Sequence, residues 1–189
     1  MSSEDALHAR VTEWVTQNYS NAEHLMQAET WLLRLQPEAP QALRLAALTH
    51  DMERAFPGPD SPTAKSGGID HDYYHAHSER SATIVGKFLR EQEVAESFIE
   101  GVTALIRVHE YGGWPEANLL QAADSLSFLQ VNVPLFLRSI PKDDDGSKRE
   151  DVRIKFAWMY ERIQVPEACE LAAPLHKAAN ERLANYVPE

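Results

Sequence analysis

The sequence predicts an all-α fold, a single-domain helical bundle, from three observations. Apolar residues recur mostly three and four positions apart, which is the spacing of one buried helix face. Runs that alternate apolar and polar residues, as β-strands do, are nearly absent. Glycine and proline gather between the periodic stretches, where they end helices. We expect eight helices, at about 4–18, 21–36, 39–54, 72–90, 92–110, 115–130, 147–164 and 167–186.

The first expected helix, at 4–18, is followed by two helices whose apolar face includes a histidine. In the second, His24 continues an apolar stripe made of Ala28, Trp31 and Leu35. In the third, His50 continues a stripe made of Leu43 and Ala47. Residues three or four positions apart share a helix face, so both imidazole rings are expected to point into the core.

The next three expected helices repeat this arrangement. His77 leads into a stripe of Ser81, Ile84 and Phe88, and His109 closes a stripe of Phe98, Val102 and Leu105. Asp124 lies in a stripe with Leu120, Phe128 and Val131. The sequence therefore predicts polar, titratable groups on the buried faces of five different helices.

The last two expected helices, at 147–164 and 167–186, have the same periodicity and are expected to pack on a core formed by about residues 20–130. The sequence has no internal repeat and no second core, so residues 1–189 are expected to form one domain. A chain of this length buries roughly 70% of its unfolded surface, which is enough for a core without disulfides.

The longest expected loop is the segment 57–70, PGPDSPTAKSGGID, which holds three prolines and three glycines. These residues disfavour helix and suit a surface loop. A loop of this length acts either as a lid over an active site or as a plain connector, and the sequence leaves both open.

Composition and charge narrow the functional classes. The formal net charge of −11 argues against nucleic acid as a partner, and a small substrate is the better prediction. No leader peptide and no stretch of roughly 18 apolar residues is present, so we expect no membrane association. The one cysteine, Cys169, favours a reducing compartment and excludes a disulfide within the chain. A cytoplasmic protein is expected, and whether it forms a homo-oligomer stays open.

The inward-pointing polar groups predict a metal site. A buried carboxylate without a partner costs several kcal/mol, and Asp51 and Asp124 would be buried among four imidazoles. A divalent cation is the simplest common partner, and this ligand set suits a transition metal better than calcium. Because consecutive residues diverge by about 100° around a helix, His50 and Asp51 could bind one ion only where helices converge at a helix end.

The ordered set resembles the HD-domain superfamily of metal-dependent phosphohydrolases. The resemblance covers about residues 20–130 and rests on six positions in this order: His24, His50, Asp51, His77, His109 and Asp124. Supporting segments are LAALTHDMER, HSERSATIVGKFL and VTALIRVHEYGGWPEANLLQAADSLSFL. The chain departs from the binuclear cyclic-dinucleotide phosphodiesterases of this superfamily, because Val108 replaces a histidine and GGWP replaces their GYP signature.

The resemblance implies a binuclear metal site. The first ion would be held by His24, His50, Asp51 and Asp124, and Asp51 would bridge to a second ion at His77 and His109. One or two divalent ions are expected, Fe or Mn by preference, with Co, Ni, Zn or Mg as alternatives. The function implied is hydrolysis of a nucleotide or another small phosphorylated metabolite by a metal-activated water.

Several residues near the ligands are candidates for further roles. Asp51, Glu79 and Arg54 are predicted as catalytic residues, and Arg54, His75 and Lys155 as substrate-binding ones. Arg54 reaches either a phosphate or a neighbouring acid such as Glu53. Glu79 and Glu110 either orient the histidines or face solvent. Of the cations on the helix around FAWMYERI, which are Arg153, Lys155 and Arg162, we expect one to line the site.

Two other functional classes remain as alternatives. Some HD-fold proteins are diiron oxygenases that cleave inositol or organophosphonates, and the six-ligand set would suit that chemistry too. A metal-containing binding module without catalysis is the third reading. His71 and His75 are either extra ligands, substrate contacts or exposed surface residues.

Overall fold

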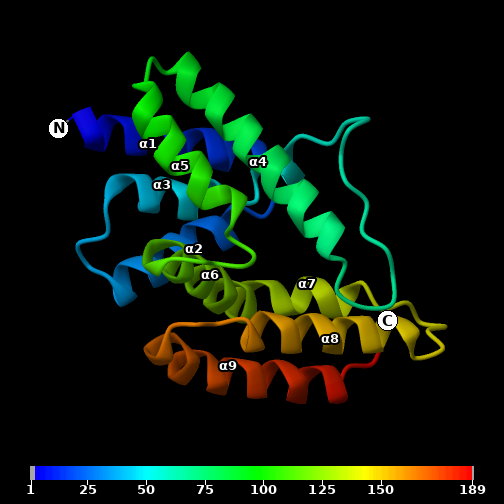
Figure 1. The fold of residues 1–189 in the computed structure, drawn as a ribbon. Coiled ribbons are helices and arrows are strands. Elements are labelled where there is room, and N and C mark those ends of the chain that lie inside the picture. Colours follow the sequence, from blue (N-terminus) through cyan, green and yellow to red (C-terminus); the bar gives the residue numbers. More distant parts are fainter. Residues whose placement is uncertain (1–2, 189) are drawn as a thin grey trace.

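The computed structural model describes residues 3–188, and within that range the chain forms helices and turns and no strand (Figure 1). The all-α prediction is confirmed. The α-helices are α1 (Ser3–Asn18), α2 (Ala22–Leu35), α3 (Gln41–Thr49), α4 (His71–Glu91), α5 (Glu96–Arg107), α6 (Pro115–Ser127), α7 (Val133–Arg138), α8 (Ser147–Glu161) and α9 (Pro166–Ala184). A 3-10 turn, η1, covers Met52–Ala55, and a π-helical turn, η2, covers Phe128–Asn132.

The helices pack as neighbouring pairs around a common core. α4 lies on α5, α2 on α6, and α8 on α9, while α3 lies between α2 and α5 (Figure 1). The two C-terminal helices contact the rest of the bundle through α6 and η2. One continuous apolar core runs through all of these elements, so residues 3–188 form a single compact helical domain.

The central helix α3 explains why the site is deep in the protein. From Leu43 to Thr49 its residues are buried except Arg44, as expected for a helix covered on all sides. His50 caps the C-terminal end of α3 and therefore lies in the middle of the bundle.

The third expected helix is shorter than predicted. α3 ends at Thr49 rather than at 54, and Asp51 lies in the turn before η1. The periodicity did not reveal this end, because a 3-10 turn keeps apolar residues at nearly the same spacing as an α-helix. The early end satisfies the condition for joint metal binding, since His50 and Asp51 lie at a helix end rather than on one helical surface.

The six-residue helix α7, Val133–Arg138, was not predicted. Pro134 lies in the first turn of this helix, where its missing N–H is not needed. The π-helical turn η2 joins α6 to α7, so the chain runs from Pro115 to Arg138 with only a local change of helical pitch.

The segment between η1 and α4 is a long loop, as predicted (Figure 1). We call residues 57–70 the lid loop. Its end is fixed by Asp70, whose side chain caps α4 by accepting from the backbone N–H of Tyr73 at 3.1 Å. Among residues 3–188, no helix is long and apolar enough to cross a membrane.

Candidate metal centre

The six predicted ligands come together in the core, although they lie on five separate segments of the chain. His24 is on α2, His50 and Asp51 follow α3, His77 is on α4, His109 follows α5, and Asp124 is on α6. All six are buried, and three of the imidazoles have an exposed fraction of 0%. Because water cannot solvate them, the ring nitrogens depend on partners within the protein.

The Nδ1 atoms of His50 and His109 face backbone carbonyls. His50 Nδ1 lies 3.0 Å from the carbonyl oxygen of Ala47, and His109 Nδ1 lies 2.7 Å from that of Ile106. A carbonyl oxygen only accepts hydrogen bonds, so Nδ1 carries the proton in both rings. The Nε2 atom of each neutral ring then presents a lone pair.

In His24 a side chain, Ser127, fixes the same tautomer, with the proton on Nδ1. The Ser127 hydroxyl donates to the carbonyl oxygen of His24 at 2.6 Å, so it accepts from Nδ1 of that ring at 2.8 Å. His77 Nδ1 donates to the Glu53 carboxylate at 3.1 Å. All four imidazoles thus use Nδ1 as a donor to the protein and direct Nε2 toward the shared centre, an arrangement typical of metal-ligating histidines.

The first cluster consists of His24, His50 and Asp124. Asp124 Oδ1 lies 3.2 Å from Nε2 of His24 and 3.3 Å from Nε2 of His50. Within residues 3–188, the buried Nε2 of His50 has no hydrogen-bond partner. Adjacent ligand atoms around one ion with bonds of about 2.1 Å lie about 3.0–3.4 Å apart. The three side chains are therefore spaced as a set of ligands to one cation.

The second cluster consists of His77, His109 and Glu110, whose ligand atoms lie within 4.8 Å of one another. Nε2 of His109 is 3.6 Å from the Glu110 carboxylate and, in the described part of the chain, is buried without a hydrogen-bond partner. Glu110 is also buried. Its carboxylate could act as a ligand of the second cluster, in which Val108 stands where the cyclic-dinucleotide phosphodiesterases have a further histidine.

Asp51 connects the two clusters. Its Oδ1 lies 2.9 Å from Nε2 of His77, and its Oδ2 lies 4.0 Å from Nε2 of His24. The two carboxylate oxygens thus face different clusters, which is the disposition that a bridging ligand requires. Oδ2 is also 3.1 Å from Nε of Arg54.

The donor set fits divalent transition metals, since it combines imidazole nitrogens with carboxylate oxygens and lacks sulfur. The Nε2 atoms of His50 and His109 support this fit, because among residues 3–188 both are buried and neither has a hydrogen-bond partner, and a bound cation would satisfy both. Burial lowers the pKa of His109 to about 4, so this ring keeps its lone pair at neutral pH.

Protons compete for the other positions in the metal-free chain. Burial lowers the pKa of His50, but the neighbouring Asp124 carboxylate outweighs that effect and raises it. For His77, burial again lowers the pKa, and the hydrogen bonds to Asp51 and Glu53 raise it overall. Metal binding would displace these protons.

Residues 2–157 match the model of a protein family described as "Domain of unknown function (DUF4202)". The chain belongs to this family. No curated protein and no solved structure matches the sequence. The all-helical fold and the buried clusters of this DUF4202 protein are compatible with an HD-type domain.

In this DUF4202 chain a cavity of about 290 Å³ opens onto the first cluster. We call it the site cavity. Its lining includes His24, Asp51 and Asp124, together with Arg54 and Lys155. Three of the predicted ligands and two cationic side chains therefore border the same space.

The π-helical turn η2 brings an amide to the site cavity. Asn132, at the end of this turn, lines the cavity together with Asn21, and its Oδ1 accepts from Asn21 Nδ2 at 2.9 Å. Departures from regular α-helix of this kind are frequent at functional sites. The amide pair gives the cavity a neutral polar wall beside its charged groups.

Arg162 also reaches the centre, from the C-terminal end of α8. Its guanidinium is paired with both Asp124 and Glu110, and its Nε donates to Ser125 Oγ at 2.9 Å. Burial alone would raise the pKa of Asp124, but Arg162 and the nearby histidines hold it well below its usual range. The carboxylate therefore stays ionised, as a metal ligand must.

The predicted substrate-binding residues divide between the cavity and the surface. Arg54 pairs with Asp51 rather than with Glu53 or a surface acid, and Lys155 donates to the Tyr74 hydroxyl at 2.9 Å. Arg153 is exposed and pairs with Glu150. Of the three cations considered around α8, Lys155 is the one that lines the site cavity, as expected, while Arg162 pairs with Asp124 and Glu110 without lining it.

The structure places Glu79 away from the site. Its carboxylate pairs with Arg107 at 3.0 Å on the surface, with 62% of the side chain exposed. Glu79 lies two residues after His77, which is a rotation of about 200° around α4. Its side chain therefore lies on the opposite face of the helix from His77. The acid that orients His77 is Glu53, which the sequence analysis considered only as a partner for Arg54.

His75 and His71 lie outside the clusters. His75 is exposed and stacks on Tyr111 with ring centroids 4.7 Å apart, and His71 Nδ1 lies 3.0 Å from the Tyr111 hydroxyl. Neither belongs to a group that could hold a metal among the described residues. Neither lines the site cavity, so the contact predicted between His75 and substrate is not formed by the walls of this cavity.

Proposed function

We propose that this protein is a metal-dependent phosphohydrolase with an HD-type centre, acting on a small phosphorylated metabolite. One observation carries the proposal: the Nε2 lone pairs and the Asp51 and Asp124 carboxylates meet beside a cavity that Arg54 and Lys155 also line. A metal centre bordered by two cationic side chains favours an anionic substrate, despite the overall charge of −11.

The ligands proposed for the ions are the two clusters and the carboxylate between them. His24, His50 and Asp124 would hold the first ion, and His77 and His109, with Glu110, the second. Bound there, divalent ions would supply the Lewis acidity that makes water a nucleophile near neutral pH and stabilises phosphoryl charge.

The side chains around the centre have separate tasks in this proposal. Arg54 presents its guanidinium to the phosphoryl oxygens while its Nε stays at Asp51, and so aligns the phosphate with the bridging carboxylate. Lys155 supplies a second positive charge from α8, and the Tyr74 hydroxyl fixes its ammonium group. Ser127 and Glu53 keep the rings of His24 and His77 in the orientation that the ligands need.

A diiron oxygenase is the second candidate. The observation in its favour is the same disposition of Asp51, whose two oxygens face the two histidine clusters. A pair of iron ions could occupy this arrangement. A binding module without catalysis would share the metal site and differ only in having no turnover.

The test is an assay of phosphate release under anaerobic conditions. Protein purified without chelator is supplied with Mn²⁺, Co²⁺ or Fe²⁺ and incubated with a panel of phosphate monoesters and nucleotides. We expect phosphate release that chelation abolishes and that Asp51→Asn lowers by at least about a hundredfold. Asp143→Asn, an exposed acid in the turn before α8, is the matched control and should retain full activity.

Three results would contradict the proposal. Release of no phosphate from any substrate by the metal-loaded protein would remove the hydrolase assignment, and oxygen-dependent turnover by the iron form would replace it with the oxygenase. Undiminished activity of Asp51→Asn would show that the catalytic centre lies elsewhere.

A further inference from the structure

A second cavity of about 320 Å³ lies beside the site cavity. We call it the lid cavity, because its walls include the lid loop, the first turn of α4 and one face of α8. Arg54, Phe136 and Lys155 line both cavities. The two spaces are therefore neighbours along one groove, with two cations at the junction between them.

The lid cavity has the opposite charge balance to the rest of the protein. Among the described residues that line it, four are cationic, namely Arg54, Lys65, Lys148 and Lys155, and one is acidic, Asp151. The whole chain has 18 Lys and Arg residues against 29 Asp and Glu residues. A wall of this composition produces a local positive potential that attracts an anion.

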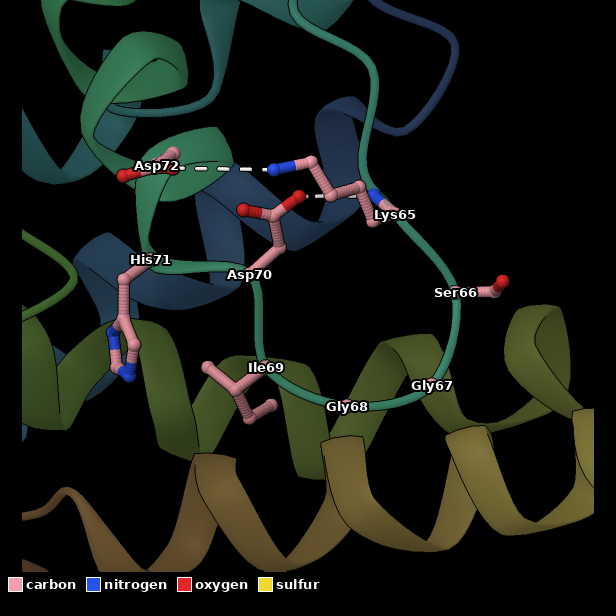
Figure 2. Close-up of a pocket in the computed structure, with 8 residues that line it drawn as sticks. All are labelled: Lys65, Ser66, Gly67, Gly68, Ile69, Asp70, His71 and Asp72. Carbon is pink, nitrogen blue, oxygen red and sulfur yellow. Dashed lines mark hydrogen bonds and ion pairs between the residues drawn. The ribbon is translucent and has the colours of Figure 1, made fainter.

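The one acidic side chain in this wall is engaged with the lid loop. Asp151 Oδ1 accepts a hydrogen bond from the backbone N–H of Gly67 at 3.1 Å. Gly67 and Gly68 have φ angles of 93° and 143°, which side-chain-bearing residues rarely adopt, so glycine allows the loop to turn where it meets α8. In Figure 2 this glycine pair forms the bend of the loop above the helices.

The backbone of Lys65 is held in place within the lid loop, whereas its side chain is only weakly paired. The backbone N–H of Lys65 donates to Asp70 Oδ2 at 2.9 Å, and its Nζ lies 3.9 Å from Asp72, as Figure 2 shows. Asp72 is exposed, so this ion pair is weak and leaves the ammonium free to move to another anion. Lys148 lines the same cavity from α8.

The remaining walls suit a carbon skeleton. The cavity is lined by the rings of Tyr73 and Tyr74 and by apolar side chains, including Ile69 and Val152. The groove thus has a metal centre at one end, two cations at its middle, and a partly apolar space with two lysines at its other end.

We propose that the lid cavity binds a second anionic group of the substrate. The substrate class is a small organic molecule with two anionic groups, of which a sugar bisphosphate is the example we test. One phosphate would lie at the metal centre, near Arg54 and Lys155, and the second between Lys65 and Lys148. This inference rests on the proposed function for the identity of the reaction, but its binding site is separate from the metal ligands.

The test compares two substrates that differ by one phosphate, fructose 1,6-bisphosphate and fructose 6-phosphate. In the metal-loaded wild type we expect a higher kcat/KM for the bisphosphate. The double variant Lys65→Gln/Lys148→Gln should lose at least about tenfold of that preference through KM, because losing even one charge-assisted contact has an effect of about that size. The control Lys87→Gln/Lys177→Gln changes two exposed lysines on α4 and α9 and should leave the preference unchanged.

A binding measurement separates this inference from the proposed function. Calorimetry with chelator-treated protein should show that fructose 1,6-bisphosphate binds more tightly than fructose 6-phosphate, and that the lysine double variant removes the difference. Lysine-dependent binding without any hydrolysis would support the lid cavity and count against the hydrolase. Equal affinity for the two sugars, or a preference that survives in the double variant, would overturn the lid-cavity proposal even if phosphate is released.

Discussion

The Ser127 hydroxyl lies 2.8 Å from Nδ1 of His24 and 2.6 Å from the carbonyl oxygen of the same residue. It connects α6 to α2, through two residues 103 positions apart in the sequence, at the predicted ligand His24. Because the hydroxyl proton goes to the carbonyl, the oxygen is left to accept from the ring. The direction of Nε2 in His24 is thus determined by a residue that is not one of the six predicted ligands.

Ser127→Ala should weaken metal binding without removing a ligand. Loss of the acceptor frees the His24 ring to rotate, and changes of this kind cost about 10- to 100-fold in metal affinity. The measurement is calorimetric titration of the chelator-treated protein with Mn²⁺ or Zn²⁺. Ser139→Ala is the control, because that serine is exposed and bonds only locally to the Phe136 carbonyl. Equal affinities for the two variants would contradict the role given to Ser127.

Arg162→Met should destabilise the metal-free protein. The substitution leaves the buried carboxylates of Asp124 and Glu110 without their shared cation, and breaking a buried ion pair from one side costs about 3–5 kcal/mol. Urea denaturation would measure the loss. Arg153→Met, an exposed arginine on the same helix, should change the free energy of unfolding by less than about 0.5 kcal/mol. Similar values for both variants would show that Arg162 is not needed to balance the site.

Substrate binding should weaken as the pH rises through about 8. Burial lowers the pKa of Lys155 to about 8, so this side chain is charged below that pH and neutral above it. The KM for a phosphate ester should therefore rise across this range at constant ionic strength. Because the substitution abolishes the titration, Lys155→Met should have a high KM that no longer changes there. A wild-type KM that stays constant from about pH 7 to 9.5 would contradict a contact between Lys155 and the substrate.

Asp151→Ala should release the lid loop. The variant removes the acceptor for the Gly67 N–H, which is the hydrogen bond between the bend of the loop and α8. We expect faster amide exchange and faster proteolysis in residues 57–70, with little change in global stability, since local openings cost less than global unfolding. Asp143→Ala is the control. Unchanged exchange of the loop in Asp151→Ala would show that other contacts hold it.

The inward direction of five of the six predicted ligands was predictable from the sequence. Each lies on an apolar stripe with helical spacing, and the structure confirms that His24, His50, His77, His109 and Asp124 are buried. The same periodicity predicted most helices to within a few residues. That these side chains meet at one point was inferred from the free-energy cost of burying unpaired carboxylates. The spacing of the residues along the chain did not show it.

The contacts that orient the ligands were not predictable in the same way. Glu53 reaches His77 because η1 packs on α4, and Arg162 reaches Asp124 because α8 packs on α6. Both contacts depend on how distant helices meet, which helical periodicity does not encode. Ser127 gave no signal at all, because a buried serine on a helix has no distinctive spacing.

The central claim is that buried imidazoles and carboxylates in this fold form a metal site. The most direct test is elemental analysis of protein purified without chelator and reloaded with Mn²⁺ or Fe²⁺, comparing the wild type with His50→Ala and His109→Ala. At the site, His50 and His109 have buried Nε2 atoms without a hydrogen-bond partner among residues 3–188. We predict two ions per chain in the wild type, loss of at least one in each variant, and full occupancy in the control His8→Ala, which changes a histidine paired with Glu29 outside the site. A wild type that binds no stoichiometric metal, or variants that bind as much as the wild type, would contradict the claim.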